Sequence, residues 1–243
     1  MPWDFTLVAF DAFCRRAAAL PFFSLADYLA ASPPEPPFVL LRLDVDYREP
    51  HAIEMARIAT GHGLRGAFYF RHPFQWDAMH AVAALGHEVG YHFETLDTCR
   101  GDFDAAADLF ARHVNEIRAT GLAITTVAAH GSTPIAPTYR NNLDLLTHDP
   151  ALLARCDLHG ETTLSVDFTR VVYLSDANWR WRRYDAYGQQ PGTAARLAAV
   201  DPGSMARGLY VNFHPQQWFE NPVAMLYFRA RNRIGSRLRR AGL

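Results

Sequence analysis

The sequence predicts an α/β fold, a β/α barrel formed by a single domain. The 243 residues are 49% hydrophobic, which is enough for one large core, and a β/α barrel uses a chain of this length as one domain. Short β-branched or aromatic runs alternate with longer stretches of helical period, as in repeated βα units around a parallel sheet. Polar residues follow the predicted strands at their carboxyl ends, where β/α barrels carry their active sites.

Residues 1–37 are predicted to flank the barrel. A helical region extends from about Phe5 to Ala31, and the prolines between Pro33 and Pro37 cannot continue it, so they form an extended lead-in. The barrel itself is expected over residues 38–218. Its predicted strands are Phe38–Asp44, Gly66–Arg71, Glu88–Phe93, Thr125–Ala129, Val171–Ser175 and Leu209–Phe213, with a weaker one at Leu158–Glu161.

Helices are predicted between these strands. Apolar residues recur at steps of three and four from Phe103 to Ile117 and stop before Gly121, and the segments 51–60 and 142–155 look similar. Residues 219–243 are predicted to add an outer helix that carries six arginines between Arg229 and Arg240. The main interpretation of this helix is a solvated surface. The second is weak contact with an acidic partner or with lipid head groups.

Composition excludes several classes of function. All 24 basic residues are arginine, so chemistry that needs a lysine amine or a P-loop lysine is ruled out. The net charge of −1 offers no field for nucleic acid, and no apolar run is long enough for a membrane span. Three widely spaced cysteines are typical of reduced thiols, which favours a cytoplasmic protein.

Asp44 and Asp46 lie two residues apart at the end of the first predicted strand. In extended backbone both side chains point to the same face, so one carboxylate can bind a metal while the other accepts a proton. The alternative is a turn-forming pair that caps the helix that follows. His214, which follows the last strand and precedes Pro215, can protonate a leaving amine.

The segment from Gly86 to Glu94 holds the clearest candidate metal ligands. Alternation places His92 and Glu94 on one face, where they can converge on one ion with Gly90 leaving space beside them. Imidazole and carboxylate are standard zinc ligands. His130, after the fourth strand, is either a third ligand or a histidine hydrogen-bonded within a buried loop.

Further polar and aromatic residues near the strand ends are candidates for substrate binding. The segment 175–183 mixes tryptophans with arginines, a combination that suits sugar rings and an anionic group. The alternative is arginine packed on tryptophan at the surface. The candidates for substrate binding are Arg71, Asp176, Trp179, Arg182 and Trp218.

The order of these motifs resembles the polysaccharide deacetylase (NodB-homology) superfamily, in particular its divergent members of surface-polysaccharide biosynthesis. The motifs are Asp-Val-Asp at 44–46, Gly-His-Glu-Val-Gly-Tyr-His at 86–92, the histidine at 130, Ser-Asp-Ala-Asn-Trp at 175–179 and Phe-His-Pro at 213–215. The resemblance implies a distorted (β/α)7 barrel and a divalent metal, usually zinc. It also implies N-deacetylation of an amino sugar or glycan intermediate.

Site roles follow from the same resemblance. It makes Asp44 the general base, Asp46 and His92 metal ligands, and His214 the general acid. Typical members have a second histidine four residues after the first, where this chain has Leu96. The third ligand is then His130, with Glu94 next and Asp97 as a further alternative. The family's Arg-Pro-Tyr motif is absent, which leaves the arginine that orients the base unassigned.

Two other functions remain open at this point. The same water could hydrolyse a formyl amide or an O-ester. A barrel that binds carbohydrate without catalysis is the alternative from another class.

Overall fold

The computed structural model describes residues 4–30, 34–131, 141–184, 192–193 and 196–240. Its strands are β1 (Phe22–Phe23), β2 (Val39–Val45), β3 (Ala67–Phe70), β4 (Glu88–Phe93), β5 (Thr126–Ala129), β6 (Gly160–Glu161), β7 (Val171–Ser175), β8 (Arg182–Tyr184), β9 (Gly192–Thr193) and β10 (Gly208–Phe213). The helices are α1 (Leu7–Ala17), α2 (Leu25–Ala30), α3 (Glu49–Gly61), α4 (Trp76–Ala84), α5 (Thr95–Thr98), α6 (Phe103–Ala119), α7 (Asp144–His148), α8 (Leu152–Arg155) and α9 (Pro222–Arg240).

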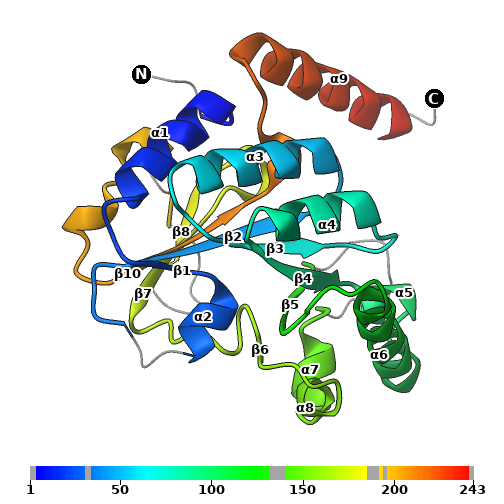
Figure 1. Ribbon diagram of the computed structural model, residues 1–243. Coiled ribbons are helices and arrows are strands. Elements are labelled where there is room, and N and C mark those ends of the chain that lie inside the picture. The colour runs from blue at the N-terminus through cyan, green and yellow to red at the C-terminus, as the bar shows by residue number, and fades with distance from the viewer. Residues whose placement is uncertain (1–3, 31–33, 132–140, 185–191, 194–195, 241–243) are drawn as a thin grey trace.

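The described strands form one curled sheet in the order β6-β5-β4-β3-β2-β10-β7-β8-β9, with β1 beside β2. Every pair from β6 to β7 is parallel, whereas β8 and β9 are antiparallel. The chain therefore steps outward from β2 to β6 and returns through β7 and β10 on the other side of β2. The result is a single mixed α/β domain around an open half-barrel, with helices such as α3, α4 and α6 outside the sheet (Figure 1).

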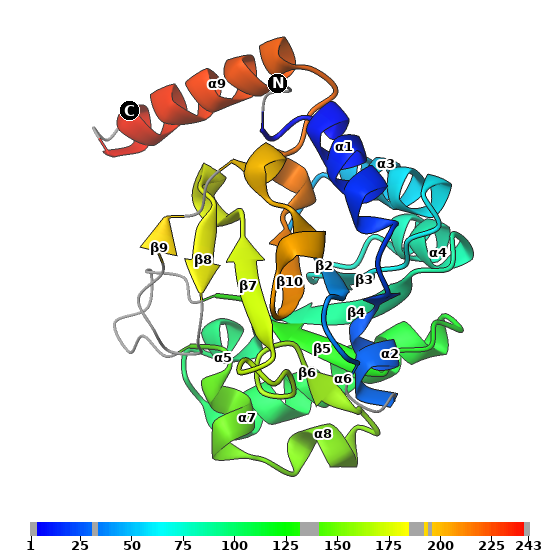
Figure 2. The same ribbon diagram turned by 90° about the vertical axis from the view of Figure 1, so that its left-hand side faces the viewer.

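The two faces of the sheet carry different side chains. Along β2, Val39, Leu41 and Leu43 join the large core beneath the helices, while Leu40 belongs to a smaller cluster. That smaller cluster combines residues of β2, β3, β5 and β10 with α2, which Figure 2 shows at the opposite end of the sheet from α9. Alternation along a strand puts Arg42 and Asp44 on the same side as Leu40. The inner side is therefore apolar near the strand starts and polar near the strand ends.

The local sequence explains the helix boundaries. The side chain of Asp102 accepts a hydrogen bond from the backbone N–H of Ala105 (3.0 Å) and begins α6, whose apolar residues then pack on the sheet. Thr6 caps α1 in the same way, at 3.3 Å from the N–H of Ala9. Pro150 follows the end of α7, so the helix expected over 142–155 is divided into α7 and α8.

The N-terminal segment differs from the expected helical flank. Instead of one helical region, α1 and α2 are separated by β1, which adds a parallel strand beside β2. Phe10 and Phe13 are fully buried, with ring centroids 5.0 Å and 5.4 Å from that of Phe213. Residues 5–17 therefore belong to the main core, because their aromatic side chains cover the outer face of β10.

Two negative expectations concern the described chain as a whole. Within the part of the chain that the structure describes, no helix has the length and apolar character to cross a membrane. Cys14, Cys99 and Cys156 are free thiols.

The sequence predicts that Gly90 leaves space for a metal ion. In the structure, the Tyr69 ring occupies that space. A Cβ at this position would lie 2.4 Å from the Tyr69 ring and 2.8 Å from the Thr126 carbonyl oxygen. We expect Gly90→Ala to lower the free energy of unfolding by about 1–3 kcal/mol, because the core has no space for the added methyl group. Urea denaturation measures this change.

Gly61→Ala is the matched control, since a Cβ at the end of α3 meets no atom within 4 Å. It should be neutral or stabilise by up to about 1 kcal/mol. Equal stabilities of the two variants would show that Gly90 is not closely packed.

Candidate metal and catalytic site

A pocket of about 730 Å³ opens at the carboxyl ends of the parallel strands. This volume lies in the range of small-molecule sites in proteins. The walls combine aromatic rings, amides and ionisable groups. They include Asp44, Asp46, Tyr47, His92, His130, Phe168, Tyr173, Asn178, Trp179, Tyr184, Asn212, His214, Gln216 and Gln217.

Asp46, His92 and His130 bring three donor atoms together at one end of this pocket. Asp46 Oδ1 lies 3.5 Å from His92 Nε2 and 3.6 Å from His130 Nε2, and one donor atom from each residue lies within 4.8 Å of the others. The residues come from the ends of β2, β4 and β5, which are far apart in the chain and close together in the sheet. The three could hold one metal ion.

The state of these side chains fits a divalent cation. The Nδ1 of His92 donates to the Ala128 carbonyl (3.1 Å), which leaves the Nε2 lone pair directed towards Asp46. Burial lowers the pKa of both His92 and His130 to about 4, so both rings are neutral at pH 7. Asp46 Oδ2 accepts a hydrogen bond from Gln216 (2.6 Å), while its buried Oδ1 has no hydrogen-bond partner among the described residues. Two neutral imidazoles and one carboxylate are a common zinc donor set.

The other candidate ligands have different partners. Glu94 forms an ion pair with Arg71 and lies 3.8 Å from His130 Nδ1, outside the group of three. Asp97 accepts a hydrogen bond from the Asn142 side chain (3.1 Å). Arg71, expected to contact substrate, instead lies beside Glu94 and 3.8 Å from Asp46, and it is not among the described residues that line the pocket.

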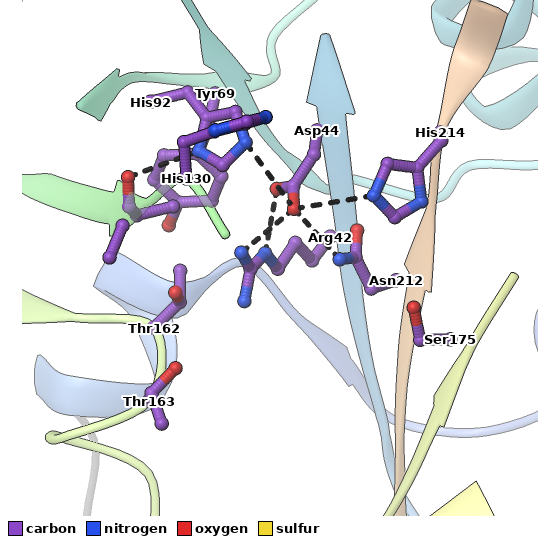
Figure 3. A network of polar contacts seen from close by, with 12 residues as sticks. Arg42, Asp44, Tyr69, His92, His130, Thr162, Thr163, Ser175, Asn212 and His214 are labelled. Carbon is purple, nitrogen blue, oxygen red and sulfur yellow. Dashed lines mark hydrogen bonds and ion pairs between the residues drawn. The ribbon is translucent and has the colours of Figure 1, made fainter. Parts of the chain in front are cut away.

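Asp44 is the most strongly held carboxylate of the pocket. Arg42 donates to both of its oxygens, from Nε at 2.7 Å and from Nη2 at 2.8 Å, and Asn212 donates a third hydrogen bond at 2.8 Å (Figure 3). Its Oδ2 also lies 3.8 Å from His92 Nε2 and 3.9 Å from His214 Nε2. Burial alone raises the pKa of Asp44, but Arg42 and the histidines hold it well below its usual range, so the group is ionised at neutral pH.

His214 lies across from Asp44 and has the opposite proton state. Its Nδ1 contacts Asp176 Oδ1 at 2.6 Å. Burial alone lowers the pKa of His214, but the charge and hydrogen bond of Asp176, together with Asp44, raise it to about 9. His214 is therefore protonated at pH 7. The pocket holds an ionised carboxylate and a protonated imidazole side by side.

Asp176 and Trp218 do not face the pocket, which corrects two of the residues expected to bind substrate. Both are fully buried. Trp218 Nε1 donates to Asp176 Oδ2 (2.6 Å), and the backbone N–H of His214 donates to the same oxygen (3.2 Å). Asp176 therefore holds His214, and Trp218 holds Asp176. The Trp218 indole has no exposed surface that could contact a sugar.

Trp179 and Arg182 also differ from each other. Trp179 lines the pocket, and its backbone N–H donates to the Gln217 side chain. Arg182 lies on β8, opposite Ser175 of β7, and does not line the pocket among the described residues. Only Trp179 of the five residues expected to bind substrate reaches the described pocket wall.

Sequence reasoning missed Arg42 and Asn212, although a signal was present. Each lies two residues before a predicted site residue, Arg42 before Asp44 and Asn212 before His214, and alternation places such pairs on one face of a strand. Arg42 is nearly fully buried, and a buried arginine needs a carboxylate partner. In this structure, Arg42 is the arginine that holds the Asp44 carboxylate.

A second group of potential ligands lies apart from the pocket. His72, His113 and Glu116 also bring one donor atom each within 4.8 Å of the others. The Tyr91 hydroxyl bonds to His113 Nδ1 at 2.6 Å, and the His72 ring stacks on His113. Any count of bound metal must therefore separate this group from the one in the pocket.

No protein-family model matches this chain, and no curated protein matches it either. Inferences about function therefore rest on the motifs and on the geometry of the pocket.

The Arg42–Asp44 pair should dominate the stability of the site. We expect Arg42→Met to lower the free energy of unfolding by about 3–5 kcal/mol, because it leaves the buried Asp44 carboxylate without its cation. Arg57→Met is the matched control, since Arg57 pairs with Glu54 at the surface, and it should cost less than about 1 kcal/mol.

Neutralising Asp44 in the Arg42→Met background distinguishes the cost of an unpaired buried charge from the cost of lost packing. The double variant Arg42→Met/Asp44→Asn should recover part of the stability in urea denaturation. Equal costs for Arg42→Met and Arg57→Met would contradict the assignment.

Proposed function

We propose that this protein is a metal-dependent hydrolase that removes an N-acyl group, such as acetyl, from an amino sugar or glycan intermediate. We further propose that its half-barrel is a divergent form of the distorted (β/α)7 barrel of the polysaccharide deacetylases. One observation carries the proposal: Asp44 and His214 lie 3.9 Å apart in one pocket, beside the Asp46, His92 and His130 donors.

Asp46, His92 and His130 would hold the metal, and zinc suits their nitrogen and oxygen donors. A divalent ion bound there supplies Lewis acidity, which polarises a carbonyl and lowers the pKa of water. Gln216 holds one Asp46 oxygen in place, and Ala128 fixes the orientation of the His92 ring. The donors are thus oriented by the fold itself.

Asp44 is suited to accept a proton. Arg42 and Asn212 hold its carboxylate in one orientation and keep it charged at neutral pH. Oδ2 faces both His92 and His214, so it points to the place where water and substrate would meet. The carboxylate is thus ionised and oriented before water arrives. Because its pKa lies well below neutral, it would act on water whose own pKa a bound metal has lowered.

His214 is suited to donate a proton. Asp176 holds Nδ1 of the ring, which leaves the Nε2–H directed into the pocket. An amide nitrogen leaves as a neutral amine only when it is protonated, so an acid that carries its proton at pH 7 favours an N-acyl over an O-acyl substrate. The opposite proton states of Asp44 and His214 match the separate tasks of base and acid.

The pocket walls suit a sugar. Tyr47, Trp179 and Tyr184 offer aromatic faces, and the side chains of Asn178 and Gln217 offer donors and acceptors for hydroxyl groups. The rival from another class is a barrel that binds carbohydrate without catalysis. It predicts glycan binding with neither bound metal nor released acid.

Metal binding is the first test of this proposal. We expect about one divalent ion per chain at the pocket, lost in Asp46→Ala and in His92→Ala because each variant removes one of three donors. Elemental mass spectrometry of tag-free protein measures it, with circular dichroism to show that the variants fold.

His72→Ala is the control for the second group of donors. Metal that stays in both pocket variants and disappears in His72→Ala would place the ion outside the pocket. No ion in wild type after supplementation would favour the binding barrel.

The pH dependence of acid release tests the role of His214. Because His214 acts in its protonated form, turnover of an N-acetylated amino sugar should be present below the pKa of about 9 and fall as pH rises through it. Asp176→Asn removes the charge that raises this pKa, so the alkaline fall should move to lower pH.

His214→Ala should lower turnover by roughly 10²–10⁴ and remove the alkaline fall while metal stays bound. Release of acid from N-formyl and O-acetyl analogues, measured alongside, compares the alternative bonds. Unchanged turnover in His214→Ala would eliminate its role as the acid.

A further inference from the structure

Helix α9 contacts the body of the protein through one side of its first half, residues 222–231, whose side chains the structure describes. Met225 is buried, and the Phe228 ring lies 5.2 Å from Phe219 and 6.2 Å from Trp179. The Arg48 guanidinium lies over the Phe228 ring, 4.5 Å from its centroid. In both views α9 lies outermost, with its C-terminal part extending beyond the helices beneath it (Figures 1 and 2).

The opposite side of α9 is apolar and exposed. Val223, Leu226 and Tyr227 are 76%, 48% and 68% exposed, and Ala230 continues their spacing of three and four residues. A surface helix normally places polar residues on its solvent side. Since the side with Met225 and Phe228 is already packed, the first half of α9 has two apolar sides, and the exposed one lacks cover among the described residues.

The charge of α9 differs from that of the rest of the chain. Residues 222–240 contain six arginines and no acidic residue, so all 25 acidic residues lie elsewhere. Arg231, at the margin of the exposed apolar side, is itself exposed. An apolar stripe bordered by arginine is the composition of helices that lie in the interface of an anionic membrane.

We propose that α9 binds the surface of an anionic bilayer, with Val223, Leu226 and Tyr227 inserted among the lipids. The charge decides between occupants. A second copy of the chain would bring another arginine-rich helix against the first, and nucleic acid would offer phosphates but no apolar surface for the stripe. Anionic lipid offers a phosphate partner to the exposed Arg231 and an apolar interior to Val223, Leu226 and Tyr227.

If α9 binds a bilayer, the position of the pocket bears on which substrate can reach it, a point that rests on the proposed function. Trp179 lines the pocket and also packs against Phe228, with the Arg229 guanidinium 5.2 Å from its ring. Membrane binding through α9 would therefore bring the Trp179 wall of the pocket close to the lipid surface. A glycan carried on a lipid would reach the pocket there.

Vesicle co-sedimentation of the full chain tests the proposal without reference to enzymatic activity. We expect binding to vesicles of phosphatidylcholine with phosphatidylglycerol, and little binding to phosphatidylcholine alone. Leu226→Asp should abolish it. Leu164→Asp is the matched control, because Leu164 is 44% exposed, lies after β6 and is remote from α9 in sequence, and it should bind like wild type.

A second pair of variants tests the charge. Arg231→Glu should weaken binding about 25-fold, since one arginine charge near an anionic surface contributes roughly fivefold and reversal adds an equal repulsion. Arg112→Glu makes the same change on the exposed side of α6 and should have little effect.

Three results would overturn the proposal. They are no binding to anionic vesicles, equal loss of binding in the α9 variants and their controls, and a dimer in solution that Leu226→Asp dissociates. If vesicles bind but no acid is released from any sugar, the membrane proposal stands and the proposed function fails.

Discussion

The buried ion pair between Arg42 and Asp44 organises the inner side of the sheet. Two residues of one strand place a cation and an anion where the curled sheet excludes most water, and each is stable there only because of the other. Arg42 also donates to the Tyr210 hydroxyl (3.4 Å), and Asn212 joins Asp44 to the Tyr173 hydroxyl (3.2 Å from Nδ2). One pair thus links β2 to β10 and β7 through polar contacts.

The same pair separates the proton states across the pocket. Arg42 keeps Asp44 ionised, and the ionised Asp44 helps Asp176 to hold a proton on His214. Burial outweighs the nearby carboxylates of Asp44 and Asp46 at His92, and those of Asp44 and Asp97 at His130, so both rings stay neutral and their lone pairs remain available. Four ionisable side chains within one pocket therefore differ in charge because of their neighbours, and this difference is what the proposed hydrolysis requires.

An aromatic cluster supports His214 from outside the sheet. Phe5, Trp179, Trp181, Trp218 and Phe219 are linked by ring contacts of 5.3–6.4 Å. These residues join the N-terminal segment, the β7–β8 connection and the base of α9. Trp218 connects this cluster to the site, because its indole N–H donates a hydrogen bond to Asp176. Residues remote from the pocket in sequence therefore fix the position of the proposed acid.

The sequence by itself determined which residues could take part. Alternation within a strand is local, so the spacing of Asp44 and Asp46 is enough to place them on one face. The same two-residue spacing relates Arg42 to Asp44 and Asn212 to His214. The parallel core strands were likewise predictable from β-branched and aromatic runs. The antiparallel strands β8 and β9 were not, because they have no such run.

Only the tertiary structure decided which candidates meet. His130 joins Asp46 and His92 because β4 and β5 are neighbours in the sheet, whereas Glu94, two residues after His92 in the chain, turns to Arg71. The sequence predicts that Trp218 binds substrate, but packing against α1 and β10 buries its side chain. Strand pairing and side-chain burial depend on contacts between segments that are distant in the chain. Periodicity within one segment does not determine those contacts.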